Sequence, residues 1–167
     1  KEESQNSFLD LLVNEGIELK KAKYLSYFTN DLSVARTLIN DPTILEAVSL
    51  YEEILKNLIN QKSGLVNLMN KIVIKFGNDK QYIKFILELI SVFLLDVMHL
   101  HMNQLIELDF KKDDLIEFMN KVNFDSTQEL IRLTHDLIKN LRLPINLSLN
   151  FAAYAILVEE IIYNGRT

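Results

Sequence analysis

Apolar residues recur at intervals of three and four along most of the chain, a spacing that predicts helices. Between Pro42 and Gln61, for example, they form one broad helical stripe. The longest expected helix, residues 79–105, is apolar nearly all round at its centre and should run through the middle of a bundle. The pattern therefore predicts an all-α fold, a helical bundle of about nine helices. We expect them at about residues 8–15, 18–28, 32–39, 42–61, 65–76, 79–105, 111–122, 126–143 and from 147 onward.

Two adjacent residues mark a boundary between two domains. Asp41 can accept hydrogen bonds from the free N–H groups of a helix, and Pro42 suits the first turn. The 40 residues before this point can bury little by themselves. We therefore expect one domain at residues 1–40 and a second, complete bundle at residues 41–167.

Three further helix starts carry capping signals. Ser126 and Glu129 have the spacing of a capping box, and Asn78 with Gln81 resembles one. Asn146 is expected to cap the last helix.

The last helix contains eight consecutive apolar residues, from Phe151 to Val158. A helix on a globular surface needs only one apolar stripe, about 100° wide. A terminal helix that is apolar on every side has a second face to bury, in its own interior or against another chain. The pattern leaves open which of Phe151, Tyr154, Leu157 and Val158 face the core and which face a partner.

Composition agrees with long helices and excludes several kinds of site. Gly occurs 4 times, Pro 2 times and Cys not at all, which excludes disulfides, thiolate metal sites and a cysteine nucleophile. The formal net charge is -5, and the basic pairs Lys20-Lys21 and Lys111-Lys112 are short enough to be solvated helix ends, so direct binding to nucleic acid is not expected. The longest apolar stretch, residues 85–95, is interrupted by Glu88 and is shorter than the roughly 20 residues of a membrane span. No signal peptide is evident, and the composition fits a cytoplasmic protein.

Candidate catalytic and metal-binding residues form no recognisable pattern. His99 and His101 diverge by roughly 200° on a helix, so they cannot share one metal ion. His135 and Asp136 with a distant serine could be catalytic, but nothing marks a nucleophile, and nucleotide-binding and hydrolase motifs do not occur. We therefore expect no enzymatic activity, metal or cofactor. Three pairs of adjacent carboxylates are expected to be solvated or to favour a helix N-terminus: Glu52-Glu53, Asp113-Asp114 and Glu159-Glu160.

The end of the chain resembles a known family. Residues 141–157 are similar to the C-terminal helix pair of the delta-prime subunits of bacterial DNA polymerase III clamp loaders. That family enters its last helix through Asn-x-Asn, and here Pro144 replaces the first Asn while Asn146 keeps the second. Residues 149–151 keep the leucine and apolar spacing of the family, whereas Ala152 stands where the family commonly has Glu.

Two segments upstream extend the resemblance. Residues 95–98 are similar to an Arg-Asp-Leu-Leu sequence on the long collar helix, with Asp96 kept and Leu95 in place of the Arg. Residues 105–109 resemble the short apolar and acidic segment that follows that helix.

The start of the chain resembles the lid helices of clamp-loader ATPase modules, through Gly16, Ala22, Leu25 and residues 30–35. Hydrolysing subunits have Gly-Ser-x-Arg-Asp-Ala in this segment, where the Arg senses nucleotide. Ser33 stands at that sensor position, as expected for the delta-prime subunit, which does not hydrolyse ATP.

The resemblance implies that residues 1–40 end a lid domain of the AAA+ type, that residues 41–167 are a collar domain, and that an ATPase-like module precedes them. In the family, five collar domains form a ring, and the assembly opens a sliding clamp and places it on primed DNA. The implied partners are gamma/tau-type and delta-type subunits, with no nucleic acid, membrane or small-molecule ligand bound by this segment. The expected interface residues are Asn146, Leu149, Phe151, Tyr154, Leu157 and Val158.

Two other interpretations remain open at this point. The chain could be an unrelated all-α interaction or scaffold module, which would lack a preceding ATPase-like module. It could also be a helical enzyme with an apolar ligand site, which would require a pocket with convergent polar groups inside the bundle.

Overall fold

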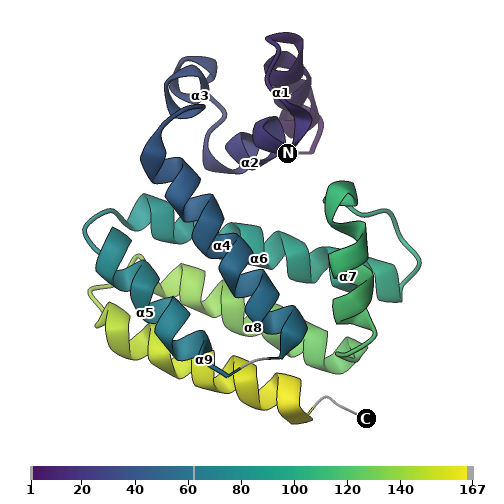
Figure 1. Ribbon diagram of the computed structural model, residues 1–167, viewed down its shortest axis with the longest axis vertical. Helices are drawn as coiled ribbons and strands as arrows, with labels where there is room; N and C mark the ends of the chain where they lie inside the picture. Colours follow the sequence, from purple (N-terminus) through teal and green to yellow (C-terminus); the bar gives the residue numbers. More distant parts are fainter. Residues whose placement is uncertain (1, 62, 165–167) are drawn as a thin grey trace. The chain divides into compact units, whose positions relative to one another are not determined.

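A computed structural model describes residues 2–61 and 63–164, with side chains from residue 7 onward, and confirms the predicted all-α fold. The described residues form nine α-helices and a 3₁₀ turn at Asp109–Lys111, with no strand (Figure 1). The helices are α1 (Glu2–Asn14), α2 (Leu19–Phe28), α3 (Leu32–Leu38), α4 (Pro42–Asn60), α5 (Leu65–Phe76), α6 (Lys80–His101), α7 (Lys112–Met119), α8 (Phe124–Asn140) and α9 (Leu147–Asn164).

The chain divides into two compact units, Lys1–Ser49 and Leu50–Thr167, called unit 1 and unit 2 below. The predicted boundary at Asp41 falls where α4 begins, whereas the two units divide within α4. The first turns of α4 therefore belong to unit 1, and the rest of the helix belongs to unit 2. The assignment of the two predicted domains to a lid and a collar stays a prediction.

Unit 1 is built from short helices that pack through small and apolar side chains. Leu12, Ala22 and Ala35, from three different helices, are fully buried. An ion pair joins two of its segments, because Arg36 of α3 donates from Nε to a carboxylate oxygen of Glu15 at 2.7 Å. The interaction is exposed, so we regard packing as the main source of stability in this unit.

Unit 2 has α6 as its most buried helix. The inward residues of α6 include Phe85, Phe93 and Val97, which are at most 2% exposed. This helix packs against α5, α7 and α8, in agreement with the predicted central position. It ends at His101, earlier than predicted, because Asn103 adopts a left-handed backbone conformation with φ 55°, which does not continue a right-handed helix.

Two of the predicted helix caps, Asp41 and Asn146, are confirmed, and Asp31 caps a further helix. The Asp31 carboxylate accepts hydrogen bonds from the backbone at the start of α3. Asp41 accepts from the N–H of Thr43 at 2.7 Å, and Asn146 accepts from the N–H of Leu149 at 3.0 Å. These side chains satisfy N–H groups that the first turn of a helix leaves free.

Two predicted caps are wrong by a few residues. The cap of α8 is Asn123, whose side-chain oxygen accepts from the N–H of Ser126 at 2.8 Å. The cap of α6 is Asp79 rather than Asn78, and it accepts from the N–H of Gln81 at 3.1 Å. In both cases several residues near the helix start can act as caps, and the spacing of polar residues alone does not choose between them.

Two of the charges predicted to be solvated are instead paired between helices. Lys111, only 9% exposed, donates from Nζ to the carboxylates of Glu52 and Asp114, the latter at 3.3 Å. The expectation for Lys111 and Glu52 is therefore wrong. A lysine can be buried when its ammonium group keeps anionic partners, and here the pairing connects α4 to the start of α7.

Candidate interaction surface on the last helix

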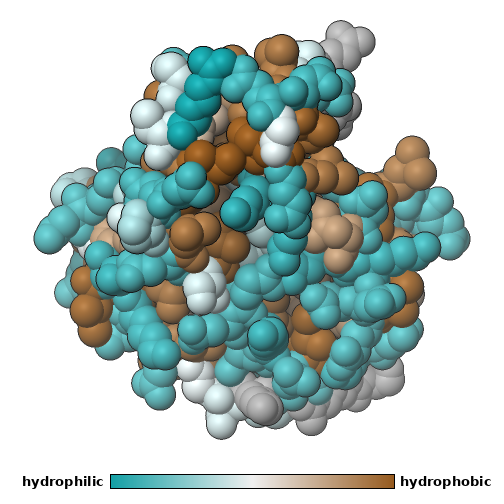
Figure 2. Space-filling view, turned by 45° about the horizontal axis from the view of Figure 1, so that its top comes forward, coloured by the Kyte–Doolittle hydropathy of each residue, from teal (hydrophilic) through white to brown (hydrophobic). Residues whose placement is uncertain are grey.

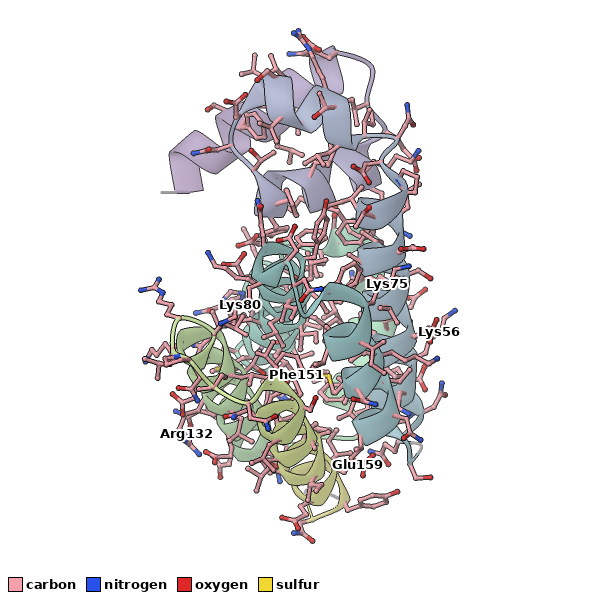
Figure 3. The ribbon with its side chains drawn as sticks, turned by 90° about the vertical axis from the view of Figure 1, so that its left-hand side faces the viewer. Lys56, Lys75, Lys80, Arg132, Phe151 and Glu159 are labelled. Carbon is pink, nitrogen blue, oxygen red and sulfur yellow. The ribbon has the colours of Figure 1, made fainter. Side chains whose placement is uncertain are left out.

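One face of α9 is part of the core of unit 2. Its buried residues recur at helical spacing, and Figure 3 shows Phe151 inside the bundle while Arg132 lies at its edge. Because α9 packs against both α5 and α8, this face is covered by two helices. The buried residues are Phe151, Tyr154, Ala155, Val158 and Ile162.

Two polar contacts fix the orientation of α9. The hydroxyl groups of Tyr154 and Thr134 of α8 are 2.8 Å apart, and burial raises the pKa of Tyr154 to about 12. The Glu159 carboxylate accepts from the N–H groups of Gly64 and Leu65 at 3.1 and 3.0 Å. Glu159 therefore caps α5 from a distant part of the sequence, and it adds a negative charge where the helix dipole favours one.

The opposite face of α9 is exposed and apolar over most of its length. Leu149 is 67% exposed, Ile156 is 49% exposed and Tyr163 is 46% exposed. Together with Ala153 and Glu160 these positions alternate by four and three residues, which is the spacing of the seam between two paired helices. Leu157, 43% exposed, lies beside this seam. We name the set the outer stripe: Leu149, Ala153, Ile156, Leu157, Glu160 and Tyr163.

The structure separates the residues expected at the interface into two groups. Phe151, Tyr154 and Val158 are at most 7% exposed, so burial assigns them to the core of unit 2. Leu149 and Leu157 are exposed on the outer stripe, while Asn146 is an exposed helix cap. The interface itself stays a prediction, now limited to the exposed positions.

Ile156 and Tyr163 belong to the exposed face, although the sequence pattern does not predict it. Polar residues normally mark the outer side of a helix. No polar residue occurs between Phe151 and Val158, so the sequence does not show which side of the helix faces outward there. The buried residues Phe151, Ala155, Val158 and Ile162 repeat with the same alternation of four and three residues, so spacing alone does not distinguish the two faces.

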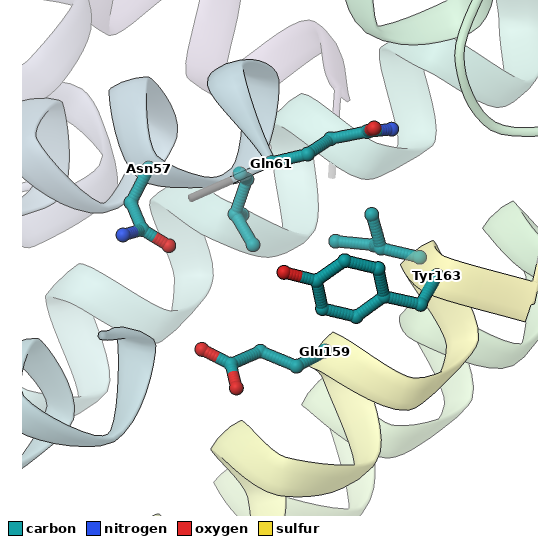
Figure 4. A pocket seen from close by; sticks show the side chains of 6 residues that line it. Asn57, Gln61, Glu159 and Tyr163 are labelled. Atoms are coloured by element: carbon teal, nitrogen blue, oxygen red, sulfur yellow. The ribbon is translucent and has the colours of Figure 1, made fainter. Parts of the chain in front are cut away.

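A small cavity lies beside the C-terminal end of the outer stripe. Asn57 and Gln61 of the α4 end line it together with Glu159 and Tyr163 of α9 (Figure 4). Its volume of about 10 Å³ is the space of a single water molecule. This cavity is far below the volume of a ligand pocket, which is at least about 300 Å³.

Unit 1 contains a larger hollow, of about 300 Å³. Apolar side chains of α2, α3 and α4 make most of its lining, including Leu25, Leu38 and Ile44. Its charged lining residues are Glu18, Lys20 and Lys21, which are neighbours at the start of α2. They do not converge from different elements, so the hollow has no arrangement of acid, base and nucleophile.

His135, the histidine of the His-Asp pair, contacts a serine of another helix. Ser91 Oγ and His135 Nε2 are 2.8 Å apart, which joins α6 to α8. Ser91 is only 5% exposed, and Asp136 accepts from Arg132 at 3.0 Å instead of orienting the histidine. The geometry therefore contains a partly buried hydrogen bond without the third group of a catalytic triad.

The two histidines at the end of α6 have separate surroundings. His101 Nε2 lies 3.1 Å from the carbonyl oxygen of Val122, whereas His99 Nδ1 lies 3.6 Å from the Asp96 carboxylate. In the described part of the chain, no three His, Asp or Glu side chains are grouped so that they could hold a metal ion. Within the same residues, no helix combines the length and the apolar character needed to cross a membrane.

Ser33 lies in the first turn of α3. Its hydroxyl donates to the Asp31 carboxylate at 2.6 Å, and its backbone N–H donates to the same oxygen at 2.8 Å. These bonds and that of Val34 hold the pKa of Asp31 below its usual value. Ser33 thus supports the helix cap, and it supplies no cation.

Hydrophobic residues reach the surface at several separate places between hydrophilic ones on the face drawn in Figure 2. Among the exposed hydrophobic residues, those of the outer stripe lie on one helix, and Leu149, Ile156 and Tyr163 recur at one regular spacing. Fold and surface therefore define an all-α protein with an exposed apolar helix face. Comparison with protein-family models, with curated proteins and with solved structures finds no match to this chain.

Proposed function

We propose that the chain is an assembly module, the C-terminal part of a clamp-loader subunit of the delta-prime class. In this role it acts without catalysis, binding gamma/tau-type and delta-type subunits in the bacterial cytoplasm during DNA replication. The observation that carries the proposal is the outer stripe. Its exposed residues have the spacing of the residues through which one helix packs against another, so a helix of another protein can pack there. The similarity of residues 141–157 to the collar of that family supports the choice of partners.

The surroundings of Ser33 support the proposal that this subunit does not sense nucleotide. The basic residue nearest to it in α3, Arg36, is paired with Glu15. A γ-phosphate needs a cation directed at it, and the start of α3 presents a hydroxyl bonded to a carboxylate instead.

The outer stripe alone is a small interface. Burying its four large side chains would contribute at most roughly 6–12 kcal/mol, at about 1.5–3 kcal/mol each. Association costs about 4–15 kcal/mol in lost translational and rotational freedom. A stable assembly therefore needs additional contacts, which a ring of subunits would supply from other parts of each collar.

Size-exclusion chromatography of purified subunits tests the proposal. We expect the chain to elute in a complex with the gamma/tau-type subunit from the same genome. Elution of both proteins at their separate volumes at micromolar concentration would contradict the clamp-loader assignment. The chain would then be better described as an all-α interaction module with a different partner, since the outer stripe would still require one.

A further inference from the structure

The hollow in unit 1 has the volume of a small-molecule site. It measures about 300 Å³, which is the lower end of the range of ligand pockets. All of its lining residues lie between Glu18 and Val48, so it belongs to unit 1 alone. The small cavity beside α9 holds one water molecule, whereas this hollow is large enough for an organic ligand.

The walls of the hollow are apolar and come from three helices. Leu25 of α2, Leu38 of α3 and Ile44 of α4 are at most 8% exposed, so packing fixes their positions. Leu45, the next residue of α4, lines the same space and is 49% exposed. Apolar area that faces water in a hollow gains free energy when an apolar group covers it.

These walls favour a hydrocarbon chain over a polar ligand. Apart from Tyr24, the uncharged lining side chains are leucine, isoleucine and valine. Such side chains neither donate nor accept hydrogen bonds, so a sugar or a nucleobase would leave its polar groups unpaired against them.

The charged side chains of the lining come from one turn of one helix. Glu18, Lys20 and Lys21 are exposed neighbours at the start of α2, and two lysines against one glutamate leave a net charge of one positive unit there. The positive end of the helix dipole adds to this charge, because Glu18 makes no side-chain cap. A ligand with a single negative charge on its head group complements this end of the hollow.

We propose that the hollow binds a medium-chain fatty acid, with its hydrocarbon chain against the walls and its carboxylate beside Lys20 and Lys21. The inference goes beyond the proposed assembly function, and it departs from the expectation that this segment binds no small molecule. It does not depend on the outer stripe, because α9 belongs to unit 2 and the hollow to unit 1.

Calorimetric titration of the full chain with octanoate tests the inference. We expect saturable binding, and binding of octan-1-ol that is weaker by at least roughly tenfold, because the alcohol has the same chain without the charge. In methyl NMR spectra octanoate should shift the signals of Leu25, Leu38 and Ile44. The signals of Leu149 and Ile156 on the outer stripe should stay unchanged.

Two substitutions at exposed lining positions separate the two parts of the ligand. Lys21→Glu should weaken octanoate binding by at least roughly tenfold and leave octan-1-ol binding unchanged. Leu45→Glu should weaken both ligands, since a charge replaces part of the apolar wall. Lys56→Glu and Ile74→Glu make the same changes at exposed positions of unit 2 and should keep the affinity of the unaltered chain. Circular dichroism of each variant establishes that the fold is retained.

Several outcomes would overturn the inference. One is the absence of saturable octanoate binding at millimolar concentration, and another is a set of methyl shifts at the outer stripe in place of the hollow, which indicates adsorption to exposed apolar surface. Equal affinity for octanoate and octan-1-ol, or a Lys21→Glu variant that behaves like Lys56→Glu, would contradict the anionic head group. None of these results bears on the assembly function, which binding to the gamma/tau-type subunit tests separately.

Discussion

Several single residues determine how the helices of unit 2 are held together. Tyr154 is an example, because its ring belongs to the core while its hydroxyl reaches Thr134 of the neighbouring helix. The Thr134 hydroxyl in turn donates to the carbonyl oxygen of Leu130 at 2.8 Å, so its oxygen accepts the hydrogen bond that the Tyr154 hydroxyl donates. Burial favours the neutral phenol, and the pKa is raised to about 12.

Replacement of Tyr154 by Phe should lower the free energy of unfolding at pH 7 by about 0.5–1.5 kcal/mol, the usual value of one hydrogen bond. In the unfolded chain a tyrosine loses its proton near pH 10, whereas folded Tyr154 keeps it to about pH 12. Between these values the folded state binds more protons, so the stability of the unaltered chain falls by about 1.4 kcal/mol per pH unit through this residue.

The variant lacks this contribution, so the difference between the two proteins should shrink above pH 10 and then reverse. Urea unfolding at pH 7 and between pH 10 and 12 measures it, with Tyr163→Phe as a control on the exposed side of the same helix. A difference that stays constant over this range would show that Tyr154 is not protected by burial.

The Asp96 carboxylate accepts the hydrogen bonds of the Glu107 and Leu108 N–H groups, which hold the loop before α7. Burial raises the pKa of its carboxyl, while the two backbone N–H donors oppose the shift. Asp96→Asn keeps one acceptor oxygen but turns an amide N–H₂ group toward a backbone N–H. We expect it to cost about 1–3 kcal/mol, because one buried donor is left without an acceptor.

Amide hydrogen exchange at Glu107 and Leu108 reports this change locally. Both amides should exchange faster in Asp96→Asn than in the unaltered chain, while amides in the middle of α8 keep their order of protection. Equal exchange at both sites in the two proteins would mean that the carboxylate does not hold the loop.

At the scale of the helices, the sequence predicted where most elements lie but not which face each presents. Apolar spacing and capping residues locate helices, since both are local. The buried face of α9 could not be assigned from the sequence, because the helix is apolar on all sides from Phe151 to Val158. Contacts such as Lys111 with Glu52 and Glu159 with Gly64 join distant parts of the chain, so no local sequence pattern predicts them.

The contact between Glu159 of α9 and the start of α5 can be tested by substitution. Glu159→Ala should lower the free energy of unfolding by about 1–2 kcal/mol, as loss of a helix cap does, because Gly64 and Leu65 lose their acceptor. The neighbouring Glu160 is exposed on the outer stripe and offers a matched control. Denaturant unfolding of Glu159→Ala and Glu160→Ala compares them, and equal stability would refute the cap.

At the scale of the whole molecule, the chain consists of two compact units, and the second ends in a helix with both a core face and an exposed apolar face. The core face explains why this helix is so apolar on one side. The outer stripe is not explained by the chain alone, because it exposes large hydrophobic residues at the spacing of a helix seam. A partner helix would account for it, and the proposed assembly supplies one.

The most direct test of this account is the dissociation constant for the gamma/tau-type subunit, measured for the unaltered chain and for a variant of the outer stripe. Leu149→Asp combined with Ile156→Asp changes exposed positions only, so the variant should fold. We expect its affinity to fall at least roughly 100-fold, since two apolar contacts are replaced by buried charges, while Ile74→Asp on α5 leaves it within about twofold. Equal affinity of the folded stripe variant and the unaltered chain would contradict the central claim that α9 binds a partner through its outer stripe.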